Sequence, residues 1–198
     1  MSKKRRKRKN GRILLITIII IFIGCFWLLN NKTLIKKDSK KDYTIESRDS
    51  ELMKKEFNIL KENYYSDNID YEKYAKSIGK LFIIDLYTIK NKNNKYDVGS
   101  VEYVHPDIRS NFKLSVGDTL YKYLEEKNYR KTKYPEVKSI EITNFSEDTF
   151  MYNNIEYNAY VVSLKWDYVK DLGYDKKGII SIIKEDKKLY VVKYEAVA

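Results

Sequence analysis

Asp85 is the residue whose type and position most suggest chemistry. It lies between Phe82 and Ile89 on the apolar face of a predicted helix. A buried carboxylate has a raised pKa unless donors or cations surround it, and such groups recur in active sites. Pairing with a tyrosine hydroxyl or Arg109, or an orientation toward the helix edge, is the more ordinary explanation. We therefore expect no enzyme, with a small hydrolase or isomerase that uses Asp85 as the alternative.

Three aromatic residues share one face of a predicted strand. Tyr160, Trp166 and Tyr168 alternate with smaller or polar neighbours, and side chains two apart lie on the same side of a strand. Such a face lines a ligand pocket or a partner surface, and packing against helices explains it equally well. Together with Asp85, these residues form the predicted ligand or partner surface.

The sequence lacks the residues that usually form a metal site, a nucleotide-binding loop or a Ser-His-acid catalytic triad. The chain has one histidine, His105, and one cysteine, Cys25, which do not make up a common metal-ligand set. The sequence contains no glycine-rich phosphate loop and no Gly-x-Ser-x-Gly turn. The position of His105 directly before Pro106 indicates a helix-capping or surface role. We expect no catalytic residues, no metal and no cofactor.

The first 29 residues predict a membrane anchor. Residues 1–12 hold eight basic residues and no acid, and residues 13–29 (Ile13 to Leu29) form an uncharged apolar segment. In a bilayer such a segment becomes a helix, because every backbone polar group must be paired internally. Its length is near the lower limit for spanning, about 17–25 residues. By the positive-inside rule the basic tail stays cytoplasmic, which predicts a single-pass signal anchor with an extracellular C-terminal domain.

Two other interpretations of this segment stay open. A basic region before an apolar run is also typical of a cleaved signal peptide, although no A-x-A-like site follows here. Residues 22–25 resemble a lipobox, in which Cys25 would be lipidated after cleavage. The bulky residues 26–29 differ from those that usually follow a lipidated cysteine, so an uncleaved anchor is favoured.

The net charge of +11 comes mostly from the amino-terminal tail. Removing its eight basic residues from the total of 39 leaves 31 basic against 28 acidic residues. Phosphate recognition needs a concentrated basic surface, so nucleic-acid binding is not indicated for the exported part. A single cysteine excludes an intrachain disulfide. Abundant Lys, Asn, Ile and Tyr suggest an AT-rich genome, as in a low-GC Gram-positive bacterium.

Behind a polar, lysine-rich tether at residues 30–48, residues 49–198 predict one α+β domain. Helical spacing of apolar residues predicts three helices, at residues 51–65, 71–89 and 106–127. The third has an inward face that includes Phe112 and Val116.

Beyond Pro135 the period of apolar residues changes from 3.6 to 2. This alternation predicts four strands, at residues 136–145, 155–168, 178–184 and 189–196. Asn153-Asn154 and residues 185–188 supply turn chemistry for antiparallel pairing. We expect the helices to pack on one face of the sheet.

The element order is similar to that of a known family. A basic tail, one span, a tether, helices and a curved four-stranded sheet resemble the bitopic assembly subunit of type IV secretion and conjugation systems. This resemblance covers the architecture of residues 13–198 and carries no functional residue. It implies the cone-shaped fold of nuclear transport factor 2-like proteins. Residues 82–92 and 171–178 also resemble segments of uncharacterised single-pass membrane proteins of Gram-positive bacteria.

These observations predict a membrane-anchored extracytoplasmic scaffold that assembles with envelope proteins or with itself, within a conjugation or secretion complex. Anchoring confines the domain to two dimensions and raises its effective concentration for other membrane-bound partners. The alternative is a membrane-tethered sensor or carrier that binds a small ligand. A deep apolar cavity would favour this alternative, and a filled core would remove it.

Overall fold

The two strongest helical patterns of the sequence form two helices that lie side by side. The computed structural model describes residues 43–125 and 134–197, and its larger compact unit begins at Ile45. In this unit α2 spans Glu51–Tyr64 and α3 spans Tyr71–Tyr87. The Ser50 hydroxyl accepts a hydrogen bond from the backbone N–H of Met53 at 3.2 Å, as expected of an N-cap. Both helices match the predicted ranges closely.

The third predicted helix, residues 106–127, is shorter and interrupted. A 3-10 turn, Pro106–Ile108, leads into α4, Arg109–Asp118. At its end the Thr119 hydroxyl donates to the carbonyl of Ser115 at 2.6 Å, and such side-chain bonds compete with helix continuation. The chain then turns and buries Tyr121, whose hydroxyl donates to the carbonyl of Leu86 at 2.8 Å. The backbone leaves helical geometry at Thr119, with φ −116° and ψ −85°, and a second 3-10 turn, Lys122–Glu125, follows. Residues 126–127 lie outside the described part.

Four strands form one antiparallel sheet in the order β1-β2-β3-β4. They are β1 (Val137–Tyr152), β2 (Ile155–Tyr168), β3 (Lys177–Glu185) and β4 (Lys188–Ala196). Asn153 and Asn154 join β1 to β2 with backbone φ angles of 50° and 63°. Both central residues of a type I′ turn need positive φ, and asparagine tolerates it. β1 is longer than predicted because pairing continues to this turn.

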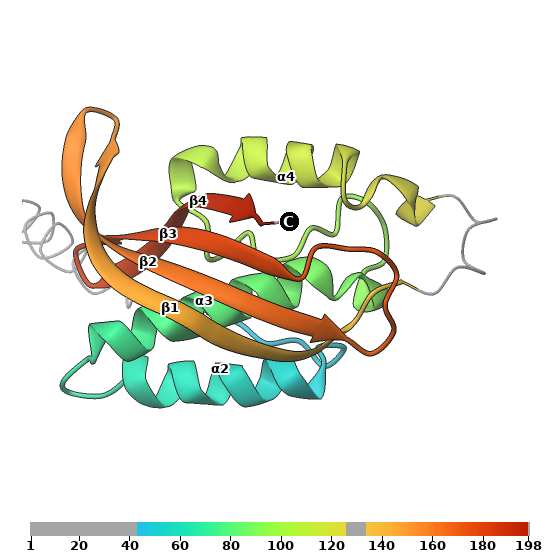
Figure 1. Cartoon of the computed structure of the whole chain (residues 1–198), viewed down its shortest axis with the longest axis horizontal. Coiled ribbons are helices and arrows are strands. Elements are labelled where there is room, and N and C mark those ends of the chain that lie inside the picture. Colours follow the sequence, from blue (N-terminus) through green and yellow to red (C-terminus); the bar gives the residue numbers. More distant parts are fainter. Residues whose placement is uncertain (1–42, 126–133, 198) are drawn as a thin grey trace, which may run out of the picture. The chain divides into compact units, whose positions relative to one another are not determined.

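The core lies between the sheet and α3. Figure 1 shows α2 and α3 along one side of the curved sheet, with α4 near β4. The largest fully buried side chains come from both layers and include Tyr74, Phe82, Leu164 and Trp166. The predicted α+β class is therefore confirmed, with helices and a four-stranded antiparallel sheet.

The end of the β1–β2 hairpin extends beyond the rest of the sheet. β3 pairs with β2 only from Ala159 to Lys165. Residues 149–158, which we name the hairpin arm, therefore have no third strand beside them, and Figure 1 shows them bending away from β3.

No helix in residues 43–125 and 134–197 is long and apolar enough to cross a membrane. The predicted basic tail (residues 1–12), the predicted span (residues 13–29) with Cys25, and residues 30–42 of the tether lie outside the described residues.

Candidate functional site

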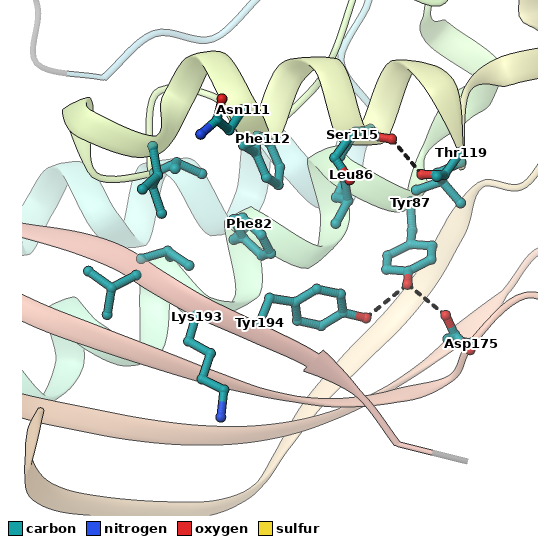
Figure 2. A pocket seen from close by; sticks show the side chains of 16 residues that line it. Phe82, Leu86, Tyr87, Asn111, Phe112, Ser115, Thr119, Asp175, Lys193 and Tyr194 are labelled. Atoms are coloured by element: carbon teal, nitrogen blue, oxygen red, sulfur yellow. Dashed lines mark hydrogen bonds between the residues drawn. The ribbon is translucent and has the colours of Figure 1, made fainter. Parts of the chain in front are cut away.

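A pocket of about 620 Å³ lies between α3, α4 and β4. It is shown in Figure 2. α3 contributes Phe82, Leu86 and Tyr87, and α4 faces them with Phe112, Val116 and neighbouring residues. β4 closes a third side with residues 191–194. This volume falls in the range typical of small-molecule sites, about 300–1,000 Å³.

Four aromatic rings line the pocket in a continuous row. The ring centroids of Phe112 and Phe82 are 5.8 Å apart, and those of Phe82 and Tyr194 are 5.6 Å apart. Tyr194 and Tyr87 follow at 6.4 Å in an edge-on arrangement. These distances are usual for stabilising aromatic pairs. The row gives the pocket an apolar wall made of flat, polarisable surfaces.

One end of the pocket is polar. The Tyr87 hydroxyl donates a hydrogen bond to Oδ2 of Asp175 at 2.9 Å, and the Tyr194 hydroxyl lies 2.8 Å from that of Tyr87. Because Tyr87 has a single hydroxyl proton, Tyr194 is the donor of the second bond. Burial raises the pKa of Tyr87 well above its usual range and that of Tyr194 to about 12. Both hydroxyls are therefore neutral at physiological pH.

The pocket exists because α4 does not pack closely on the sheet. Phe112, which was predicted to face inward, is only partly buried, as are Ile108 and Leu120, whereas Val116 is buried. After α4, the hydroxyl of Tyr121 fastens the chain to α3. Before α4, backbone hydrogen bonds join Tyr103 and His105 to Val191 of β4. The helix is thus held at both ends, with its apolar face lining an open space.

Two of the four sequence-predicted residues lie behind the polar end of the pocket. Trp166 is buried, and its ring centroid is 5.2 Å from that of Tyr87. Its Nε1–H donates to the Tyr168 hydroxyl at 2.8 Å, which in turn donates to the backbone carbonyl of Asp175 at 2.6 Å. Trp166 and Tyr168 therefore do not line the pocket, but they position Tyr87 and Asp175, which do.

The third sequence-predicted residue, Tyr160, is remote from this pocket. Its ring stacks on that of Phe145 in the paired strand β1, with centroids 5.8 Å apart. The side chain is partly buried, so it covers this region of the sheet without lining the pocket.

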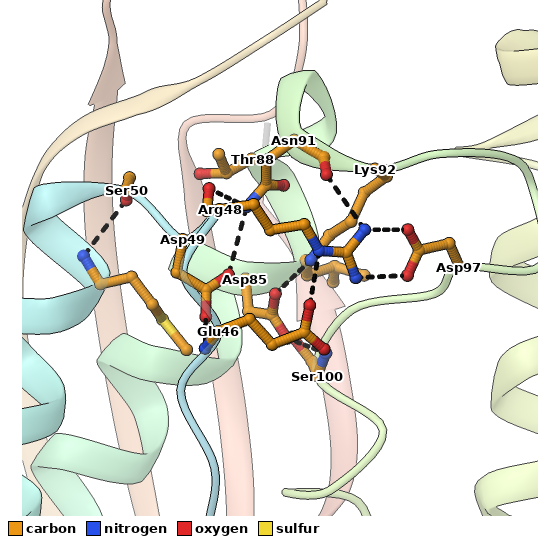
Figure 3. A network of polar contacts seen from close by, with 12 residues as sticks. Glu46, Arg48, Asp49, Ser50, Asp85, Thr88, Asn91, Lys92, Asp97 and Ser100 are labelled. Carbon is orange, nitrogen blue, oxygen red and sulfur yellow. Dashed lines mark hydrogen bonds and ion pairs between the residues drawn. The ribbon is translucent and has the colours of Figure 1, made fainter.

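The fourth, Asp85, belongs to a separate polar network, which Figure 3 shows. Its carboxylate pairs with the Lys92 ammonium and accepts a hydrogen bond from the backbone N–H of Ser100. The side chains of Lys92 and Asp85 are only 4% and 15% exposed. The partners are thus Lys92 and Ser100, while Arg109 donates to the carbonyls of Val104 and Glu102 instead.

The loop around Asp85 approaches the helix closely. A Cβ atom at Gly99 would lie 2.4 Å from the backbone oxygen of Asp85, so only glycine fits there. Ser100 follows with a positive φ of 67°, and its N–H donates to the Asp85 carboxylate. The arrangement has the features of a structural clamp that fastens residues 92–100 to α3.

Arg48 holds the segment before α2 in the same network. Its guanidinium forms a two-point ion pair with Asp97 and donates to the carbonyl of Asn91 at 3.2 Å. The Arg48 hydrogen bond lowers the pKa of Asp97, and burial raises that of Asp49 nearby. Residues 45–48 of the predicted tether are therefore in contact with the folded domain.

His105 caps the 3-10 turn before α4, as its position predicted, but it is buried. Its ring centroid lies 4.7 Å from that of Tyr152 in the hairpin arm and 5.4 Å from that of Tyr190 in β4. Nε2 is 3.4 Å from a carboxylate oxygen of Glu185. His105 thus joins the arm to the sheet.

Sequence reasoning missed the residues that line the pocket, notably Tyr87, Asp175 and Tyr194. In β4 the buried residues Leu189 and Val191 alternate, but Val192 has no partner in β3, and this irregularity shifts the alternation before Tyr194. Tyr87 ends the apolar face of α3. Neither pattern reveals an open space between elements. In residues 43–125 and 134–197, no group of three potential metal-ligating side chains occurs.

Comparison of the chain with protein families, with curated proteins and with solved structures finds no match to any of them.

Proposed function

We propose that this domain binds a small amphipathic molecule in the pocket between α3, α4 and β4. The observation that carries the proposal is the 620 Å³ pocket itself, lined by a row of aromatic rings and ended by a hydrogen-bonded polar group. Apolar walls with a few convergent polar groups are the usual composition of a ligand site. A filled core would have argued against such a function.

The proposal includes the predicted membrane topology. The span at residues 13–29 and the basic tail before it would present the domain outside the cell membrane, in a single-pass arrangement. The protein would then act as a membrane-tethered sensor or carrier. The cone-shaped fold of nuclear transport factor 2-like proteins fits this proposal, because it also places helices over a curved antiparallel sheet.

We propose binding without catalysis. Among the described residues that line the pocket, Asp175 is the one carboxylate, and none is a histidine or a cysteine. A lone acid without a second acid–base group makes poor catalytic machinery. Asp85, the acid singled out from the sequence, is committed to Lys92 and Ser100.

Methyl NMR of the full-length chain in lipid nanodiscs tests the proposal. With isoleucine, leucine and valine methyl groups labelled, a panel of small amphipathic compounds is added in turn. We expect saturable shifts at the pocket methyl groups of Val104, Ile108, Val116, Leu120 and Val191. Shifts that occur only elsewhere, or none across the panel, would reject the pocket as a ligand site.

A second candidate function, assembly with envelope proteins or self-association, is favoured by the hairpin arm. Met151 and Ile155 in the arm are 63% and 55% exposed, and exposed apolar residues recur in partner surfaces. Tethering at the membrane would allow weak contacts of this arm to suffice.

Crosslinking in intact membranes tests this second candidate. The Met151→Lys/Ile155→Lys variant is compared with Val169→Lys, which alters an apolar residue that is 62% exposed but lies outside the arm. Loss of crosslinked species in the arm variant alone would support assembly through the arm. Identical crosslinking in the wild type and both variants would remove the arm as an interface.

A further inference from the structure

We propose that the pocket prefers a ligand with a protonated amine on an apolar body, because Asp175 and the aromatic rings beside it together form a cation site. This inference rests on the proposed function and specifies the class of ligand. In the part of the chain that the structure describes, two charged side chains line the pocket, Asp175 and Lys193, and the inference depends on which of them is available to a ligand.

Asp175 offers a carboxylate that no cation neutralises within the described residues. Its Oδ2 accepts a hydrogen bond from the neutral hydroxyl of Tyr87. Lys176, the next residue, pairs instead with Asp171 at 2.6 Å. The carboxylate of Asp175, an exposed residue, is therefore held in place at the end of the pocket without a cationic partner among the described residues.

Lys193, in contrast, has a partner. Its Nζ lies 2.9 Å from an oxygen of Glu195. Figure 2 shows its side chain directed away from the rings of Phe82 and Tyr194, whereas the Asp175 carboxylate lies against the Tyr87 hydroxyl. The charge that the pocket presents to a ligand is thus negative.

The aromatic row strengthens this preference. An ammonium group within about 6 Å of an aromatic centroid is attracted by the ring face. Tyr87 and Tyr194 adjoin the carboxylate, and Phe82 and Phe112 continue the row toward the apolar part. A cation would gain from both the rings and the carboxylate, whereas an anionic ligand would be repelled by Asp175.

Three matched probes separate charge from apolar shape: 4-phenylbutylamine, 4-phenylbutanol and 4-phenylbutyrate. The full chain carrying Trp27→Phe is placed in nanodiscs of uncharged phosphatidylcholine, which leaves Trp166 as its single tryptophan. Trp166 lies directly behind Tyr87, so its fluorescence reports on the pocket. We expect the amine to bind at least about tenfold more tightly than the alcohol, and the carboxylate to bind most weakly.

Asp175→Asn keeps a hydrogen-bond acceptor for Tyr87 and removes the charge. We expect this variant to lose most of the preference for the amine. Asp148→Asn is the matched control, because Asp148 is an exposed acid on β1 that has no ion-pair partner among the described residues and does not line the pocket. It should keep the wild-type preference.

The outcomes distinguish the ligand class from the pocket function. Equal binding of amine and alcohol, or an amine preference that survives in Asp175→Asn, would overturn the amine inference while leaving a neutral-ligand pocket. If none of the three probes binds, the amine inference fails, and the methyl NMR panel decides whether the pocket function fails with it.

Discussion

The hydroxyl of Tyr87 lies 2.9 Å from Oδ2 of Asp175 and joins the end of α3 to the loop between β2 and β3. This contact bridges 88 residues of sequence. It creates the polar end of the pocket, and Trp166 and Tyr168 support it from behind. The proposed ligand site therefore depends on side chains from a helix, a loop and strands that meet only in the folded domain.

Replacing Asp85 tests whether this acid is structural. In Asp85→Asn the ammonium of Lys92, only 4% exposed, loses its carboxylate partner. We expect the free energy of unfolding to fall by about 3 kcal/mol, the usual cost of leaving a buried charge unpaired. Urea unfolding of the full chain, followed by circular dichroism, measures the change.

The double variant Asp85→Asn/Lys92→Met is the control for that experiment. Removing both charges should recover part of the lost stability, because no buried ammonium remains unpaired. A fully stable Asp85→Asn variant would show that the ion pair with Lys92 does not fasten the loop, and would return Asp85 to the list of candidate functional acids.

The Arg48–Asp97 pair predicts a dependence of stability on pH. Hydrogen bonding to Arg48 lowers the pKa of Asp97 from its ordinary value of 3.8. The pair therefore contributes its full stability above the ordinary carboxyl pKa, and this contribution is lost as the pH falls through the lowered pKa. Asp97→Asn should destabilise the domain by about 1 kcal/mol near neutral pH, with the difference from wild type vanishing at strongly acidic pH.

Unfolding free energies of wild type and Asp97→Asn across this pH range measure the effect. Asp118→Asn serves as the comparison, since Asp118 is largely exposed and 3.8 Å from Lys95. A difference between wild type and Asp97→Asn that is constant at every pH would contradict the electrostatic explanation.

Trp166→Phe separates support of the pocket from contact with the ligand. The change removes the Nε1–H bond to Tyr168 and part of a fully buried ring. We expect a loss of about 2 kcal/mol in unfolding free energy, with little change in ligand affinity at temperatures where the variant is folded. The control is Tyr168→Phe, which alters the hydrogen-bond partner of Trp166. If Trp166→Phe lost ligand binding while Tyr168→Phe bound normally, Trp166 would be in direct contact with the ligand.

Helices and strands with strong apolar periodicity were predicted well from the sequence. The distances between neighbouring elements in the fold were not. α2, α3 and β2 follow regular apolar patterns and occur close to the expected residues. β1 continues to Tyr152 because the turn at Asn153-Asn154 aligns its far end with β2. The polar residues 146–149 show no alternating pattern, since this part of the hairpin has no core to face.

The candidate site was harder to predict from the sequence than the helices and strands were. Phe112 was expected to lie in the core from its helical spacing, and the same spacing is compatible with a pocket wall. Periodicity gives the face of an element but not the distance to its neighbour, which here is set by long-range contacts such as that of Tyr121 with Leu86. Asp85 was predicted inward, and its partners Lys92 and Ser100 come from a loop without a regular pattern.

The most direct test of the proposed ligand site is to fill it. Asn111 and Ser115 lie one turn apart on α4, line the pocket and are exposed, so Asn111→Phe/Ser115→Phe should occupy it without disturbing the buried core. Ser110→Phe/Lys113→Phe adds two rings to α4 at exposed positions that do not line the pocket. Titration of both full-length variants in nanodiscs with a compound that shifts the wild-type pocket methyl groups is the decisive measurement. We predict that binding is lost in the filled variant and retained in the control, and unchanged binding in the filled variant would contradict the account.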